Sequence, residues 1–261
     1  MPPPCEGARE PKANGRLVFL SAEKQTPRSL RSLPPSQGGG EPANLSKAAK
    51  LARLESFSMP KVYSIDGITP VVHPSAFVHP SAVLIGDVMV GARAYIGPCA
   101  SLRGDFGRII VEEGANIQDS CILHGFAGKD TVVGADCTIG HGAVLHGCVL
   151  GRGALVGMNA VVNDNAEVGE HAIIAALAFV KAEERIPARS LAAGIPAKVR
   201  RTVTDQEIAW KHENLLVYQD LAVRSMKSMK EVEALTQAEP GRRRFEFPTS
   251  VPLSELKKQH G

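Results

Sequence analysis

The sequence predicts an all-β solenoid of about six coils followed by one C-terminal α-helix. Aliphatic residues recur every six positions over most of residues 72–180. Neither a helix with 3.6 residues per turn nor a simple strand with period two produces that spacing. Glycine is abundant, at 25 of 261 residues, whereas aromatic residues make up only 5%. Short repeats with many tight turns indicate stacked coils, since a sandwich of short strands would space its strands irregularly, by about 8–12 residues.

Eighteen hexads can be counted, and three hexads close one triangular coil, which gives the six predicted coils. Three extra residues follow Leu102 and four follow Leu123. Glycine follows many of the aliphatic residues and suits the corners, because it tolerates positive φ. We expect the coils within residues 59–182, with hexads beginning at Val72, Val78, Leu84, Val90, Ile96, Leu102, Val111, Ile117, Leu123, Val133, Ile139, Leu145, Leu150, Val156, Val162, Val168, Ile174 and Val180.

Residues 183–232 are predicted to close the solenoid and form the helix. Thr204 followed by Glu207 is a capping box, so the helix should run from about Asp205 to Val232. Apolar residues recur every seven positions and should pack along the coils; they are Ile208, Leu215, Ala222 and Met229. The tail, residues 233–261, carries three arginines at 242–244, whose role stays open between a solvated cluster and a contact to coenzyme A phosphates.

The first 58 residues differ in composition from the rest of the chain. They hold eight of the 18 prolines, and nine Lys/Arg against five Glu, a balance of +4. Such a segment buries too little apolar surface to fold alone, so we expect a disordered or non-native extension, with Met59 as the natural start. Because the formal charge of the whole chain is +3, the remainder is near −1, which disfavours a nucleic-acid surface.

The thiols and the apolar runs indicate a cytoplasmic protein. The five cysteines form no CxxC pair, which favours reduced thiols over disulfides. No apolar run approaches the roughly 18 residues of a membrane span. The apolar residues 17–20 are too few for a signal-peptide core of about 7–15 residues. We therefore expect neither a membrane nor a nucleic acid as a partner.

Three histidines occupy defined positions in the repeat. Leu123 and Leu145 begin hexads on the same face, so His124 and His146, which follow them, should stack on neighbouring coils about 5 Å apart. His141 lies one face earlier and points around the corner, away from an ion bound by the other two. Packing three copies about an axis would bring each His141 to the stacked pair of the next copy. The spacing therefore predicts a homotrimer with three intersubunit metal sites, each with three His ligands and an open position.

Polar residues surround the predicted metal site. Arg103 lies on the face of the stacked histidines, one coil below, and Asp105 is in the same corner. Gln118 and Asp119 lie beneath the third histidine and would face Arg103 and Asp105 of the next copy. The carboxylates balance the arginine, and an amide can orient a metal-bound water without adding charge. A salt bridge between subunits is an equally open interpretation of Asp119.

The segments RGDFGRIIVEEGANIQDSCILHG (103–125) and TIGHGAVLHGC (138–148) resemble the γ-class carbonic anhydrase superfamily. The match covers roughly residues 59–232. Within the superfamily the sequence looks most like the branch of phenylacetic acid degradation protein Y and carnitine operon protein E, of which GDFGRI, LVGMNAVV, FVKA and EPGRRR are typical. The resemblance implies that the parallel β-helix is left-handed.

The resemblance also implies roles for individual residues. The family's metal ligands fall on His124, His146 and the neighbouring copy's His141. Zinc is the metal expected there, although three imidazoles also suit Fe, Co or Ni. The family's anion-positioning arginine, its water-orienting glutamine and the aspartates that support them fall on Arg103, Gln118, Asp105 and Asp119.

Two departures from the family bear on the activity. Active archaeal-type enzymes have a glutamate just after the Asp of the RGD segment and a second glutamate as proton shuttle, where this chain has Phe106 and Ala127. A fast hydratase must export a proton at each turnover, so the loss of both carboxylates disfavours rapid CO2 hydration. Phe106 would also make the pocket more apolar, which better suits an organic acyl group.

The resemblance implies an acyl-CoA thioesterase linked to phenylacetic acid degradation. In this reaction a metal-activated water attacks the thioester carbonyl. Carbonic anhydrase activity, with CO2 and bicarbonate as the small-molecule substrates, is one alternative. A hexapeptide-repeat acyltransferase is a second, although it needs one His base and no metal. The identity of the acyl group and of the metal stays open.

Overall fold

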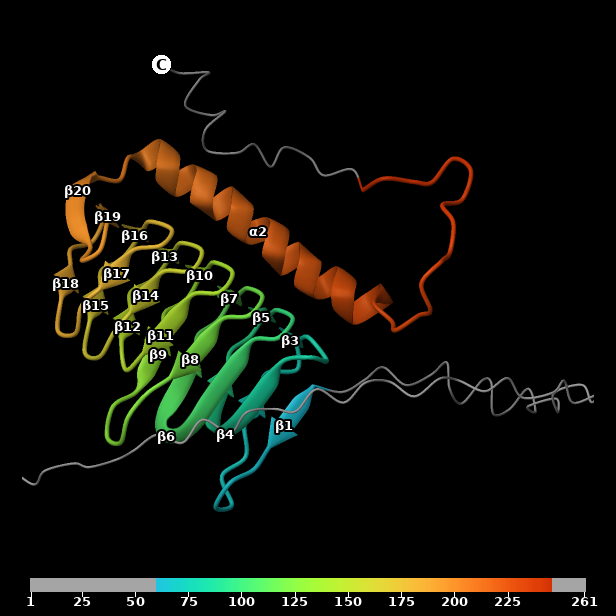
Figure 1. Ribbon diagram of the computed structural model, residues 1–261, viewed down its shortest axis with the longest axis horizontal. Coiled ribbons are helices and arrows are strands. Elements are labelled where there is room, and N and C mark those ends of the chain that lie inside the picture. Colours follow the sequence, from blue (N-terminus) through green and yellow to red (C-terminus); the bar gives the residue numbers. More distant parts are fainter. Residues whose placement is uncertain (1–59, 246–261) are drawn as a thin grey trace, which may run out of the picture. The chain divides into compact units, whose positions relative to one another are not determined.

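The computed structural model describes residues 60–245. Over this range the chain winds into a parallel β-solenoid of about seven turns, followed by the helix α2 (Asp205–Ser228) (Figure 1). The predicted solenoid and C-terminal helix are therefore confirmed, whereas assembly into a trimer stays a prediction. The extension over residues 1–58 lies outside the described residues, as does the tail beyond residue 245.

Three parallel ladders form the walls of the solenoid. The first wall consists of β1 (Lys61–Tyr63), the first halves of β4 (Val83–Val90) and β6 (Ser101–Val111), β8 (Ile122–His124), β11 (Val144–His146), β14 (Val161–Val162) and β17 (Phe179–Val180). The second wall consists of β2 (Val71–Val72), the second halves of β4 and β6, β9 (Thr131–Val133), β12 (Val149–Leu150), β15 (Glu167–Val168) and β18 (Arg185–Ile186).

The third wall completes each turn. It consists of β3 (Phe77–Val78), β5 (Tyr95–Ile96), β7 (Asn116–Ile117), β10 (Thr138–Ile139), β13 (Leu155–Val156), β16 (Ile173–Ile174) and β19 (Ser190–Ala193). The strand β20 (Lys198–Thr202) pairs antiparallel with β19 and ends the ladder.

The solenoid extends beyond the predicted boundary at residue 182, and the predicted six coils are about one too few. The strands β18 and β19 continue the parallel ladders. Ile186 and Ala192 keep the six-residue step after Val180, and both are buried. Alanine at the last position is too small to stand out as a hexad start, which explains why the aliphatic pattern stops earlier than the strands do.

The core is a stack of aliphatic residues with small residues beside them. The hexad starts, such as Leu123 and Leu145, are fully buried. Alanine usually lies two positions before each hexad start, but Cys121, Cys137 and Cys148 take that position directly before β8, β10 and β12. Burial raises the pKa of the Cys121 thiol to about 11 and of the other two to about 12, although backbone hydrogen bonds partly oppose it. All three cysteines are free thiols, in agreement with the sequence.

The helix α2 begins as its capping box predicts. Thr204 accepts a hydrogen bond from the backbone N–H of Glu207, whose carboxylate accepts one from the backbone of Thr204. The helix ends at Ser228, four residues before the predicted end at Val232. Helix continuation there would bring the carboxylate of Glu231 to the negative end of the helix dipole. No helix in the described part of the chain is long and apolar enough to span a membrane.

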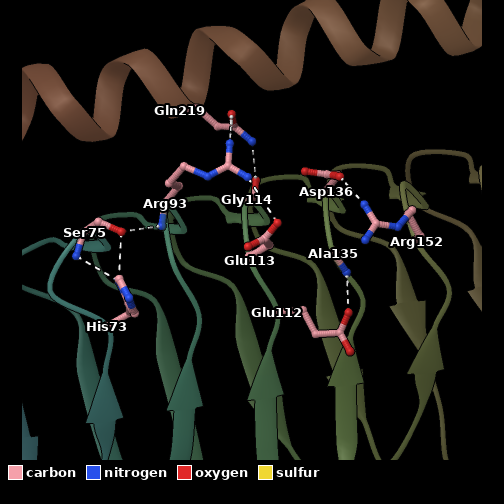
Figure 2. A network of polar contacts seen from close by, with 10 residues as sticks. All are labelled: His73, Ser75, Arg93, Glu112, Glu113, Gly114, Ala135, Asp136, Arg152 and Gln219. Carbon is pink, nitrogen blue, oxygen red and sulfur yellow. Dashed lines mark hydrogen bonds and ion pairs between the residues drawn. The ribbon is translucent and has the colours of Figure 1, made fainter.

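Aromatic and polar contacts hold α2 against the third wall. Tyr218 contacts the ring of Tyr95, which stacks on Phe77 at 5.4 Å between centroids. Gln219 accepts a hydrogen bond from Arg93 and donates one to the backbone carbonyl of Gly114 (Figure 2). The predicted packing of the helix along the coils is thus confirmed, and the helix covers one corner of the solenoid.

Candidate metal centre

Two of the predicted ligands face each other across neighbouring turns. His124 and His146 end the strands β8 and β11 and are directly opposite in the parallel ladder. Their ring centroids lie 5.1 Å apart, as the hexad count predicts. The Nδ1 atom of His124 is 3.1 Å from Nε2 of His146. The two rings thus point one nitrogen each at a common space at the corner between the first and second walls.

Arg103 and Asp105 lie at the same corner, one turn below. The carboxylate of Asp105 contacts Nε2 of His124 at 3.0 Å and accepts a hydrogen bond from Nε of Arg103 at 3.1 Å. Partial burial alone would raise the pKa of Asp105, but these hydrogen bonds and the charge of Arg103 together hold it below its usual value. Asp105 is therefore an anion that faces both the arginine and the first histidine.

The local backbone explains how this corner is built. The strands β4 and β6 pass from the first wall to the second without a break, and Gly104 lies directly over the backbone of Asp87. A Cβ atom on Gly104 would come within 2.2 Å of the Asp87 carbonyl oxygen, so only glycine fits. The three extra residues of the repeat are accommodated here, and they place Asp105 and Phe106 at the edge of the site.

Asp164 is part of this cluster, although the sequence analysis did not single it out. Its carboxylate contacts Nδ1 of His146. Leu145 pairs with Val162 of the next turn, 17 residues later, so Asp164 lies at the same corner, one residue beyond the position directly above His146. The register that aligned the two histidines leads to Asn163 and not to Asp164.

His141 lies at a different corner, between the third and first walls. Its Nδ1 atom is 2.8 Å from the carboxylate of Asp119, and both side chains are exposed. Within residues 60–245 of one chain, no group of three or more His, Cys, Asp or Glu side chains is arranged to hold a metal. The structure thus brings Arg103 and Asp105 to the stacked pair but keeps His141 and Asp119 apart from it.

Gln118 lies one turn below His141 but differs from it in exposure. Its side chain is only 6% exposed, and its Nε2 atom donates a hydrogen bond to the side-chain oxygen of Asn116 at 3.1 Å. Asn116 in turn donates to the hydroxyl of Thr138. This chain of hydrogen bonds fixes the amide of Gln118 and leaves its carbonyl oxygen as the atom that can accept from a water.

The three histidines share a feature that suits metal ligation. One ring nitrogen of each histidine contacts a carboxylate: Asp105 for His124, Asp164 for His146 and Asp119 for His141. Metal-binding histidines almost always use their second nitrogen in this way, since the partner fixes the tautomer and the ring orientation. The 3.1 Å between the facing nitrogens of the stacked pair is close to the separation of about 3.3 Å for two ligands of one tetrahedral zinc. The donor set therefore fits a zinc ion.

Two phenylalanines line the same corner. Phe106 is 67% exposed, and its ring centroid lies 5.4 Å from that of His124. Phe126 stacks on His146 with 6.3 Å between centroids. The predicted apolar character near Phe106 is thus present in the structure, and an apolar group can lie against both rings.

Comparison with known proteins identifies the family. Carnitine operon protein CaiE of Salmonella typhimurium is 59% identical over 189 residues, which cover 72% of this chain and 96% of that protein. The chain belongs to the CaiE family of hexapeptide-repeat proteins. Its γ-carbonic-anhydrase-like character agrees with the motifs at residues 103–125 and 138–148. The CaiE protein of Salmonella dublin is 58% identical with the same coverage.

More distant relatives share the repeat. The family model for the bacterial transferase hexapeptide (six repeats) matches residues 147–182. A Bacillus cereus protein described as a proposed acetyltransferase is 33% identical, with a TM-score of 0.62 over 63% of this chain and 96% of the other. A hexapeptide transferase family protein from Anaplasma phagocytophilum is 37% identical, with a TM-score of 0.60 over 62% and 96%. This CaiE family member therefore belongs to a group that consists mostly of enzymes.

Proposed function

We propose that this protein is a metal-dependent acyl-CoA thioesterase that acts in aromatic acid degradation, with phenylacetyl-type thioesters as the first substrates to test. The observation that carries the proposal is the set of three histidines, each with a carboxylate against its second nitrogen. The apolar wall of Phe106 and Phe126 beside the stacked pair supports an organic acyl group rather than CO2.

The complete site requires more than one copy of the chain. The outward-facing residues that directly precede the hexad starts of the first wall form one ladder, which is apolar except at Lys61 and Ser101: Lys61, Val83, Ser101, Ile122, Val144, Val161 and Phe179. Ile122 is 46% exposed in the single chain. Burying such a surface is favourable, and this wall lies between the two corners that carry the histidines. Three copies packed by their first walls would bring His141 of one copy to the stacked pair of the next, as a homotrimer.

Each side chain then has a defined task. A zinc ion held by the three histidines would lower the pKa of a bound water to about 7 and would act as a Lewis acid toward the carbonyl oxygen of the substrate. Gln118 accepts a hydrogen bond from the attacking water through its carbonyl oxygen. Arg103, held by Asp105, binds an anionic or oxygenated group of the substrate. Asp164 keeps the ring of His146 in the ligating orientation.

Two other activities use parts of the same arrangement. The pair of Arg103 and Asp105 beside the histidines favours carbonic anhydrase chemistry, but Phe106 stands where a carboxylate would help to export protons. An acyltransferase is favoured by the names of the structural relatives. It would use one histidine as a base and would keep its activity when the metal is removed.

The decisive experiment combines metal analysis with three assays. We expect bound zinc in the purified protein and hydrolysis of phenylacetyl-CoA that is lost after chelation and restored by zinc. CO2 hydration and acyl transfer to an amine or alcohol are measured in parallel. If the metal-free protein transfers acyl groups as fast as the metal-loaded protein does, the proposal of a thioesterase is refuted.

Mixing two inactive variants tests the shared site. His124→Ala and His141→Ala each remove one ligand, and neither alone should be active. When the two are unfolded and refolded together as random trimers, about a quarter of the sites combine an intact pair with an intact His141. We expect about a quarter of the wild-type activity, and no recovery would contradict the intersubunit site. His73→Ala, in a turn where the ring contacts Ser75, is the matched control and should stay fully active.

A further inference from the structure

A second cluster of basic residues lies under the N-terminal half of α2, at the corner between the second and third walls. A cavity of about 210 Å³ separates the helix from the coils there. Lys211 and His212 line it from the helix, and His171, Arg152 and Asp136 line it from the coils. It shares no residue with the proposed metal centre.

Lys211 is unusual for a lysine because it is only 7% exposed. Its ammonium group donates to the backbone carbonyl of Gly153. Within residues 60–245, no carboxylate forms an ion pair with it. Burial lowers the pKa of Lys211. Lysine is almost never buried without a counter-charge, yet the carboxylate that lines this cavity, Asp136, pairs with Arg152 and not with Lys211.

His171 provides a second unsatisfied group at the same cavity. Its Nδ1 atom is buried and has no hydrogen-bond partner in the described part of the chain. Burial is the main cause that lowers its pKa, and the charge of Lys211 adds to this, so the ring is neutral near pH 7. A neutral ring can still donate from Nδ1 in one of its two tautomers. At the rim, Arg152 is more exposed and pairs with Asp136 at 2.6 Å (Figure 2).

We infer that this cavity is a binding site for a small oxyanion, such as inorganic phosphate or a short carboxylate. One oxyanion between the helix and the coils accepts hydrogen bonds from the Lys211 ammonium and from Nδ1–H of His171. It supplies the negative charge that Lys211 otherwise lacks, while the more exposed Arg152 at the rim attracts anions from solvent. Because the ligand contacts both α2 and the coils, its binding also joins the helix to the solenoid.

Titration calorimetry on the full chain tests the site, with inorganic phosphate in one arm and acetate in the other, at constant ionic strength. We expect saturable binding of one anion per chain, and the arm with higher affinity identifies the anion class. Lys211→Met keeps the length of the side chain and removes its charge, and it should weaken binding at least tenfold. Lys227→Met, in the last turn of α2, is the matched control and should bind as the wild type does.

A second variant tests the same site in case Lys211→Met does not fold. His171→Phe keeps a ring of similar size without the Nδ1 donor, and it should also weaken binding at least several-fold. Thermal unfolding gives an independent readout, since phosphate should raise the Tm of the wild type and of Lys227→Met but not of Lys211→Met. The inference is overturned if neither anion binds the wild type saturably, or if Lys211→Met and His171→Phe, while folded, bind as tightly as the wild type.

Discussion

Replacing Asp164 with asparagine tests whether the carboxylates behind the histidines tune a metal site. Asp164 contacts Nδ1 of His146, whose Nε2 atom faces His124 at 3.1 Å. Asparagine keeps the shape of the side chain, but a neutral amide holds the imidazole tautomer more weakly. Partners of this kind contribute about 10- to 100-fold to metal affinity. The Asp164 side chain is 38% exposed, against 18% for Asp105, and solvent screens the more exposed contact.

We therefore expect Asp164→Asn to weaken zinc affinity about tenfold, equivalent to about 1.4 kcal/mol, and Asp105→Asn to weaken it more. The affinity is measured by competition with a chelator of known affinity on the metal-free full chain. Glu167→Gln, an exposed carboxylate of β15 that pairs with Arg185, is the matched control and should leave the affinity unchanged. If Asp164→Asn binds zinc as tightly as the wild type, His146 is not a ligand oriented by Asp164, and the reasoning for the site fails.

Three further predictions follow from the core and the pocket. Leu145→Ala should lower the free energy of unfolding in urea by about 2–5 kcal/mol, because the side chain is fully buried; a loss below about 1 kcal/mol would contradict this packing. Raising the pH from 9 to 10 should destabilise the protein by about 3 kcal/mol through Cys121, Cys137 and Cys148, about 1 kcal/mol for each thiol. Their folded-state pKa values lie above the ordinary 9.0, so the unfolded chain loses these protons first as the pH rises. In urea titrations at the two pH values, a Cys148→Ala variant should lose about a third of the pH dependence of the unfolding free energy. Phe106→Glu should raise the ratio of CO2 hydration to thioester hydrolysis, and an unchanged ratio would show that Phe106 does not select the substrate.

The fold was predictable because one hexad corresponds to one wall and one corner. Every hexad start is an aliphatic residue, and the error in the number of turns came from Ala192, where the wall continues with a small residue. The end of α2 was missed by four residues, since the apolar stripe includes Met229, whose backbone is already extended. A pattern of side chains thus predicts the walls well and the termini of elements less well.

For the candidate site, the sequence predicts which residues lie opposite each other in neighbouring turns but not which side chains contact one another. The count of residues aligned His124 with His146, and the parallel ladder has that register. The direction of a side chain depends on its rotamer and on its neighbours, so the burial of Gln118 against Asn116 could not be foreseen. Asp164 was not predicted, because the five-residue step after Leu145 shortens this turn to 17 residues and the register leads from His146 to Asn163.

The interruptions of the repeat coincide with the proposed site. The three extra residues after Leu102 form the bend of β6 that carries Arg103, Asp105 and Phe106. The four extra residues after Leu123 form the segment that places Phe126 against His146.

The shortened step that follows Leu145 contains Gly147, with a φ of +56°, where a Cβ atom would lie 2.7 Å from the ring of Phe126. All three irregularities meet at one corner, whereas uniform hexads suffice to build the rest of the core. In a solenoid the regular repeats provide rigidity, so the residues that break the period are the ones free to serve chemistry. The irregularities of the repeat and the stacked histidines thus lie at the same corner, at the ends of β8 and β11.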